Sequence, residues 1–193
     1  PVSIREPPIA SKPTPSSLVT ADQRTVAPVA WDCNCLEEVC GACTMVVNGR
    51  VRQACSALVD RLLEARPGEI ELRPMSKFPV VRDLIVERSR LFQGLQRVKA
   101  WVAVDSYMDL GPGPRRPRQQ QEEAYPLSKC MSCGCCLEAC PQFTKIEVPR
   151  IEGESEVQHV ARRAKAYAHA FLGAHAISQA MLFNSHPSGT MEA

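Results

Sequence analysis

The sequence lacks a long apolar run, a secretory signal and any sizeable net charge, and each absence excludes a class of protein. A helix that spans a bilayer needs about 20 consecutive apolar residues. The most apolar candidate, residues 166–183, is interrupted by His169, His175, Ser178 and Gln179, so we expect a packed helix there. No charged segment followed by an apolar one opens the sequence. The formal net charge of +2 gives no reason to expect nucleic-acid binding.

Cysteine, by contrast, is abundant, with ten among 193 residues. The chain is too long and too apolar for a secreted miniprotein held together by disulfides. Its cysteines are clustered at short spacings, which indicates free thiolates that bind metal in a reducing compartment. The length allows one or two domains with a modest core.

The first cysteine array consists of Cys35, Cys40, Cys43 and Cys55. Its C-x4-C-x2-C…C spacing is the plant-type pattern for a [2Fe–2S] cluster. Between the last two ligands, Asn48-Gly49 is flanked by strand formers and predicts a β-hairpin that returns Cys55 to the loop. Cys33 lies outside the spacing, and we interpret it as a bystander thiol. A zinc site or disulfides are the alternative readings of this array.

The second cysteine array consists of Cys130, Cys133, Cys136 and Cys140, with Pro141 next. Its C-x2-C-x2-C-x3-C-P spacing is typical of bacterial-type ferredoxins that hold cubane iron–sulfur clusters. In that pattern three thiolates converge on one cluster and the fourth ligates a different one. Zinc sites usually show two C-x2-C pairs with a longer span between them, so we disfavour zinc or a disulfide cluster. Cys135 is out of register and is predicted not to be a ligand.

The remainder of the chain divides into segments of different composition. A proline-rich start gives way to a β-prone stretch at 26–31, a strand at 69–74 and an amphipathic helix at 89–98. Further on, a Gly/Pro/Arg-rich stretch reads as a linker. The sequence thus predicts a disordered leader (1–25), a [2Fe–2S] domain (26–108), a linker (109–126) and a helical domain (127–193).

Two helices are expected after the second array. Ser155 and Gln158 have the spacing of a capping box, which predicts a helix start. One apolar helical face follows, made of Val157, Val160, Ala161, Ala164, Ala168, Phe171 and Leu172. Gly173 suits the end of this helix, and a shorter helix should follow to Phe183. The four histidines are predicted to be packed or surface residues, because none lies at ligand spacing from a cysteine.

The two arrays in this order resemble the iron–sulfur subunit of succinate dehydrogenase and fumarate reductase. Residues 31–43, 78–84, 109–115 and 182–187 are similar to the Bacillus-type, menaquinone-linked branch of that family. The resemblance implies an α+β fold, with a partial plant-ferredoxin-like β-grasp domain followed by an all-α bacterial-ferredoxin-like domain.

The resemblance also implies site residues and cofactors. Cys35, Cys40, Cys43 and Cys55 would ligate [2Fe–2S]; Cys130, Cys133 and Cys136 would supply three ligands of [4Fe–4S]; Cys140 would supply one ligand of [3Fe–4S]. Single electrons would pass from flavin through the three clusters to quinone. No residue of this chain would act as an acid, a base or a nucleophile.

The partners implied are a flavoprotein subunit and a membrane anchor that binds quinone, in a tricarboxylic acid cycle complex. The subunit would be peripheral, on the cytoplasmic face of a bacterial inner membrane. The family's second cysteine set would fall beyond Ala193, and its opening strands have no counterpart in the leader. We therefore expect a truncated member whose sheet has an exposed edge. Lys145 stands where ubiquinone-reducing relatives carry tryptophan, so quinone contacts are not transferred.

Three alternatives differ from this reading. The same cofactors could serve a related complex, such as a thiol-dependent fumarate reductase or a heterodisulfide-reductase-like assembly. A zinc-binding interaction module would have no redox role. An inactive fragment would bind no cluster.

Overall fold

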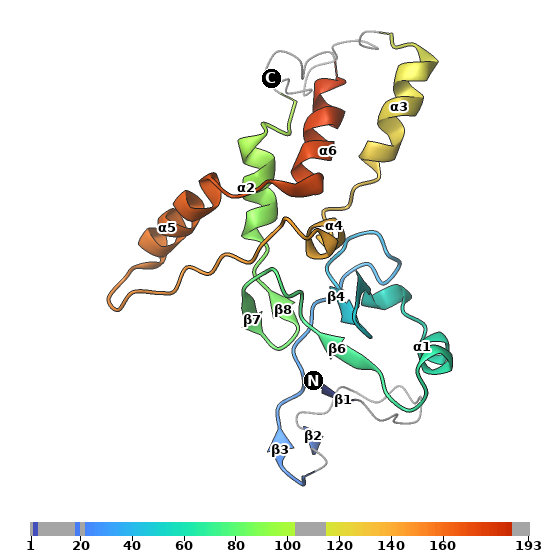
Figure 1. Cartoon of the computed structure of the whole chain (residues 1–193), viewed down its shortest axis with the longest axis vertical. Helices are drawn as coiled ribbons and strands as arrows, with labels where there is room; N and C mark the ends of the chain where they lie inside the picture. The colour runs from blue at the N-terminus through green and yellow to red at the C-terminus, as the bar shows by residue number, and fades with distance from the viewer. Residues whose placement is uncertain (1, 4–17, 20–21, 103–114, 187–193) are drawn as a thin grey trace. The chain divides into compact units, whose positions relative to one another are not determined.

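The computed structural model describes residues 2–3, 18–19, 22–102 and 115–186, which form two compact units (Figure 1). The first unit comprises Pro1–Ser76 and Val80–Val86, and the second comprises Lys77–Pro79 and Glu87–Ala193. The part of the chain predicted as a disordered leader lies mostly outside the described residues.

The first unit is built on a four-stranded antiparallel sheet in the order β1 (Val2–Ser3), β6 (Glu71–Arg73), β4 (Thr44–Val47) and β5 (Arg50–Gln53). The predicted Asn48-Gly49 hairpin is confirmed, since β4 pairs with β5 across these two residues. Both have positive φ angles, 48° and 78°, as a tight type I′ turn requires. The Asn48 side chain accepts the Glu71 amide at 2.8 Å, which ties the turn to β6.

A small core lies against this sheet. Met45 and Val47 alternate along β4 and are buried together with Leu84. Partly buried apolar residues pack around them, one of them from helix α1 (Val59–Ala65): Val29, Ala54, Leu62, Ile70 and Leu72. The predicted strand at 69–74 is confirmed in its central residues.

The first unit also contains two short antiparallel strand pairs: β2 (Leu18–Val19) with β3 (Thr25–Val26), and β7 (Val80–Arg82) with β8 (Ile85–Val86). The strand predicted at 26–31 is wrong beyond Val26. A side chain replaces the strand ladder there, because Ala30 donates its amide to Asp83 Oδ2 at 2.8 Å. The Ala30 carbonyl in turn accepts the Leu84 amide at 3.1 Å.

The second unit is helical. It contains α2 (Ser89–Arg97), α3 (Arg118–Ser128), α4 (Cys135–Ala139), α5 (Glu156–Ala168) and α6 (Gly173–Asn184). Helix α6 packs on α2, α3 and α4, and α5 packs on α2. The helix predicted at 89–98 is confirmed as α2, but it is grouped with this unit and not with residues 26–86. Helix α3 begins inside the segment predicted as a linker, of which 109–114 lie outside the described residues.

A buried arginine organises the packing of this unit. The Arg90 side chain is only 7% exposed and lies over the Phe143 ring, 3.7 Å from its centroid. It donates to the carbonyls of Thr144 at 2.6 Å and Phe171 at 3.3 Å. The cation is therefore held by backbone dipoles and an aromatic face, which offset its loss of hydration.

Helix α5 starts as predicted but buries an unexpected face. The capping box is confirmed, since Gln158 donates its amide to Ser155 Oγ at 3.3 Å and Ser155 donates its own to Gln158 Oε1 at 3.0 Å. The expected packing of the apolar face is wrong, because Val157 is 79% exposed and its apolar neighbours on α5 are exposed too. His159 and Tyr167 are buried in their place. Gly173 begins α6 and does not end α5.

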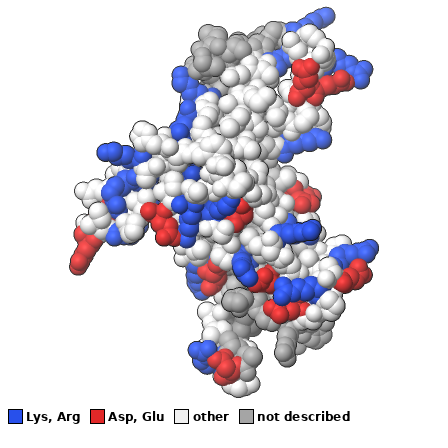
Figure 2. Space-filling view, in the orientation of Figure 1, with Lys and Arg blue, Asp and Glu red and all other residues white. Residues whose placement is uncertain are grey.

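Surface charges of both signs are interspersed on the face drawn in Figure 2. Many form local ion pairs, such as Arg61 with Glu64 at 3.1 Å and Arg118 with Glu122 at 2.6 Å. Exposed pairs of this kind contribute about 0–1 kcal/mol each. They shape the solubility of the chain more than its stability.

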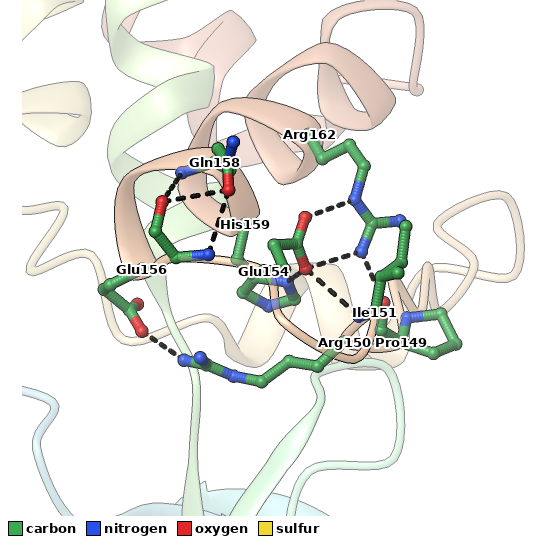
Figure 3. Close-up of polar contacts among 9 residues, drawn as sticks. Pro149, Arg150, Ile151, Glu154, Glu156, Gln158, His159 and Arg162 are labelled. Atoms are coloured by element: carbon green, nitrogen blue, oxygen red, sulfur yellow. Dashed lines mark hydrogen bonds and ion pairs between the residues drawn. The ribbon is translucent and has the colours of Figure 1, made fainter.

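One acidic side chain closes the loop before α5 (Figure 3). Glu154 accepts hydrogen bonds from Arg162 Nε at 2.7 Å, from the Ile151 amide at 3.2 Å and from His159 Nδ1 at 3.1 Å. Its side chain is only 6% exposed. The hydrogen bond from Arg162 is the main cause that lowers the pKa of Glu154 to about 2.

The Glu154 contacts predict a specific pH dependence of stability. Because the pKa of Glu154 is about 2 in the folded chain and near 4.5 otherwise, its contribution is complete above the higher value. It is lost as the pH falls toward the lower one. We expect Glu154→Gln to lower the free energy of unfolding at neutral pH, and the difference from wild type to shrink on acidification. Urea unfolding followed by far-UV circular dichroism measures this, and the exposed Glu152→Gln serves as control. A difference that stays constant with pH would contradict the assignment.

Two glycines allow the cost of a steric clash to be distinguished from the cost of backbone strain. Gly173 and Gly153 have φ angles of 78° and 79°, but a Cβ at Gly173 would overlap Leu137 Cδ2, while one at Gly153 meets nothing within 4 Å. We expect Gly153→Ala to destabilise by about 1–2 kcal/mol and Gly173→Ala by about 1–3 kcal/mol more. Chemical denaturation of both variants tests this. Equal losses would show that α6 and α4 are not in tight contact at this point.

Candidate iron–sulfur site

The first cysteine array lies in a loop whose backbone is turned toward sulfur. Leu36, Glu38 and Gly41 have positive φ angles of 60°, 60° and 69°, so left-handed residues recur along this loop. Backbone of this kind forms concave nests in which successive N–H groups point at one anion. The Cys35 sulfur accepts the amides of Glu37, Val39 and Cys40 at 3.5, 3.3 and 3.3 Å.

The other three thiols of this array also receive amides. Cys55, in the 3-10 turn η1 (Ala54–Ser56) after β5, accepts the Glu38 amide at 3.3 Å. Cys40 accepts the Ala42 amide at 3.4 Å, and Cys43 accepts the Cys55 amide at 3.5 Å. The hairpin thus returns the fourth thiol to the loop that carries the first three. Cys33, the predicted bystander, is exposed.

These contacts move the thiol pKa values in opposite directions. Amide donation, first from Glu37 and then from Val39 and Cys40, lowers the pKa of Cys35 to about 7. The pKa of Cys55 is raised, chiefly by its hydrogen bond with Cys43. Cys35 therefore has a larger thiolate fraction near neutral pH than an ordinary cysteine, and the thiolate is the form that binds iron.

The second cysteine array surrounds the start of α4. Ser132 and Gly134 have positive φ angles of 54° and 86°, which curl the chain between Cys130 and Cys136. The pKa of Cys136 is raised by lost hydration and then by the charges of Cys133 and Cys130. Cys135 is half-buried at the first position of α4.

Cys140 ends α4 and is held by a residue that the sequence did not point to. The Lys77 ammonium donates to the Cys140 carbonyl, and the Lys77 amide donates to Glu138 Oε2 at 3.1 Å. Lys77 lies 63 positions from Cys140, and no local pattern marks such a partner. This lysine fixes the backbone that carries the fourth thiol of the array.

All ten cysteines fall within the described residues, and none of them forms a disulfide. In that part of the chain, no group of three or more Cys, His, Asp or Glu side chains lies close enough to hold a single metal ion. An iron–sulfur cluster spreads its thiolate ligands over several iron atoms, so it does not need four ligands around one ion. Each of the four sulfurs of the first array accepts at least one backbone amide, and amide donors of this kind suit the anionic sulfurs of a cluster.

Comparison with known proteins decides the family. Residues 11–93 match the family described as "2Fe-2S iron-sulfur cluster binding domain". The succinate dehydrogenase iron–sulfur subunit of Bacillus subtilis is 51% identical over 164 residues, which cover 85% of this chain and 54% of that one. The chain is a relative of the iron–sulfur subunits of succinate dehydrogenase and fumarate reductase. The fumarate reductase iron–sulfur subunit of Wolinella succinogenes is 32% identical, over 68% of this chain and 54% of its own length.

A solved structure supports the fold of this chain. A chain of the Mycobacterium smegmatis Sdh1 complex in the apo form aligns with a TM-score of 0.53 at 24% identity, covering 83% of this chain and 58% of that one. The expected mixture of strands and helices with a [2Fe–2S] ferredoxin-type domain is thus confirmed, and the finer β-grasp arrangement stays a prediction. The chain spans about half the length of the curated relatives it matches. Among the described helices, none has the length and apolar character to cross a membrane.

The ligand assignment predicts which cysteines are needed for the [2Fe–2S] cluster. We expect serine at any one of Cys35, Cys40, Cys43 or Cys55 to reduce the cluster signal to background, because each thiolate holds one of its two irons. Cys33→Ser is the matched control and should keep the full signal. Iron and acid-labile sulfide per chain, together with the EPR spectrum of the reduced protein, measure the outcome. Loss of the cluster in the control, or its retention in a ligand variant, would contradict the assignment.

Proposed function

We propose that the chain is the electron-transfer iron–sulfur subunit of a membrane-bound succinate:quinone oxidoreductase. It relays single electrons between a flavoprotein subunit and quinone. The observation that carries this proposal is the amide-lined first array, followed in the same chain by the second array at ferredoxin spacing. The 51% identity to a succinate dehydrogenase iron–sulfur subunit supports it independently.

The first array would hold the [2Fe–2S] cluster through Cys35, Cys40, Cys43 and Cys55. The cluster supplies one-electron redox chemistry when bound, and the chain supplies its setting. Amides of residues 37–40 direct partial positive charge at sulfur, which stabilises the more negative state and raises the potential. Leu36 and Val39 on the same loop are 63% and 60% exposed, so the loop is accessible to a partner.

The second array would continue the relay. Cys130, Cys133 and Cys136 supply three ligands for a [4Fe–4S] cluster, and Cys140 supplies one for a [3Fe–4S] cluster. The ligand sets of both clusters are incomplete in residues 1–193. Clusters of these types cover potentials of roughly −700 to +450 mV, set by hydrogen bonds, burial and charge. No side chain of this chain acts as an acid, a base or a nucleophile.

The partners in this proposal are a flavoprotein subunit and a quinone-binding membrane anchor. The subunit is placed peripherally at the cytoplasmic face of a bacterial inner membrane. The likeness to the Wolinella succinogenes fumarate reductase subunit makes fumarate reduction by the same electron path the second candidate. Both directions use the same ligands.

The proposal predicts reduction by succinate only through a flavoprotein. The chain is reconstituted anaerobically with iron and sulfide, and mixed with the succinate dehydrogenase flavoprotein subunit of Bacillus subtilis. Succinate should then produce the EPR signal of the reduced [2Fe–2S] cluster, and dithionite should produce it without the flavoprotein. Cys40→Ser is the control and should give neither signal. If the folded chain takes up no iron or sulfide, the proposed electron-transfer function is wrong. If dithionite reduces the cluster but succinate does not, the assignment of a flavoprotein partner is wrong.

A further inference from the structure

A hydrogen bond joins α6 to the second cysteine array through two residues that the electron relay does not use. His175, in the first turn of α6, places Nε2 at 2.9 Å from Ser132 Oγ. Ser132 lies between Cys130 and Cys133, and the two partners are 43 positions apart in the sequence. In Figure 1, α6 and the short α4 that follows this turn lie side by side, in agreement with their contacts.

The conformation of Ser132 needs support. Its φ angle of 54° lies in the left-handed region, which is unfavourable for a residue with a Cβ. A serine in this conformation persists only where its surroundings hold it. The contact with His175 is tertiary and can supply this restraint, and it acts at the turn that separates two predicted ligands.

The support comes from a rigid element. His175 is 3% exposed and Ala176, beside it, is fully buried. Gly173, two residues before, lies so close to Leu137 of α4 that a Cβ would overlap that side chain. The packing of α6 on α4 therefore fixes the position of His175 relative to the array.

The polar character of His175 is not needed for that packing. Burial lowers the pKa of His175, so the ring is neutral and brings no charge to the array. A buried polar ring costs free energy unless it is hydrogen-bonded, and an apolar side chain would fill the same space without that cost. The hydrogen bond to Ser132 is the gain that offsets it.

We propose that His175 is a positioning residue for the second cysteine array: its hydrogen bond to Ser132 holds the turn between Cys130 and Cys133 in the form that presents both thiolates to one cluster. The proposal rests on the proposed function only in naming an iron–sulfur cluster as the ligand. The arrangement of the two thiols can be measured without iron.

The first test therefore uses a dithiol reagent. Phenylarsine oxide bridges two thiols only when they lie close together, and peptide mass mapping shows which pair it bridges. With the full chain free of iron, we expect His175→Leu and Ser132→Ala to slow bridging of Cys130 and Cys133 several-fold. His175→Gln keeps a hydrogen-bonding group and should restore most of the rate. Bridging of Cys40 and Cys43, in the first array, is the internal reference and should not change.

The second test uses the chain reconstituted with iron, sulfide and dithiothreitol, a small thiol that can complete the ligand set. The same two variants should hold less of the second cluster, or release it several-fold faster to a chelator, with the [2Fe–2S] signal unchanged. The double variant should be no worse than the single ones, because both remove the same bond. Thermal unfolding of each variant identifies any general loss of fold.

The outcomes separate the two proposals. If neither variant changes bridging of Cys130 and Cys133, the role of His175 is wrong, whatever the iron content. If His175→Leu slows bridging but Ser132→Ala does not, the histidine acts by packing alone and the proposal is also wrong. If both slow bridging while the chain takes up no iron, the positioning role stands and the proposed electron-transfer function falls.

Discussion

Hydrogen bonds from backbone amides to cysteine sulfur are the interaction on which the first unit depends. Three amides converge on Cys35 and one on Cys55. They require left-handed backbone at Leu36 and Glu38, which are not glycines, so the loop carries local strain. An anionic cluster held by this loop would offset such strain, because it would give the inward amides a charged acceptor. The loop conformation thus costs free energy on its own, and the binding of an anionic ligand would stabilise it.

The helical unit also buries polar groups that need hydrogen-bond partners, but these groups are charged side chains and not cysteine sulfurs. Arg90 is buried among carbonyls and an aromatic ring, and Glu154 is buried among donors. Each ion is surrounded by groups that satisfy its hydrogen bonds, so neither is left unpaired in a poorly hydrated place. Through Thr144 and Phe171, Arg90 joins the segment after the second array to the start of α6. Charged side chains, together with apolar contacts, therefore hold segments of this unit together.

Short-range features of this fold could be predicted from the sequence. The cysteine spacings, the Asn48-Gly49 turn and the Ser155 capping box each depend on residues a few positions apart, and the structure forms both the turn and the box. Contacts across 43 to 63 positions were missed: His175 with Ser132, Lys77 with Cys140 and Asp83 with Ala30. Periodicity showed which residues of α5 share an apolar face, but it contains no information about what covers that face. There the buried side is the one with His159 and Tyr167.

The path of the chain between Cys43 and Cys55 links cofactor insertion to strand pairing. Three thiols sit on one continuous loop, but the fourth arrives only after β4 and β5 have paired in register. A cluster that binds early in folding would lack its fourth ligand until the hairpin forms. Under the proposed ligand assignment, closure of the sheet edge would complete the coordination, and the free energy of metal capture would become free energy of folding for this unit. Maturation of the cofactor and formation of the tertiary structure would then be a single event.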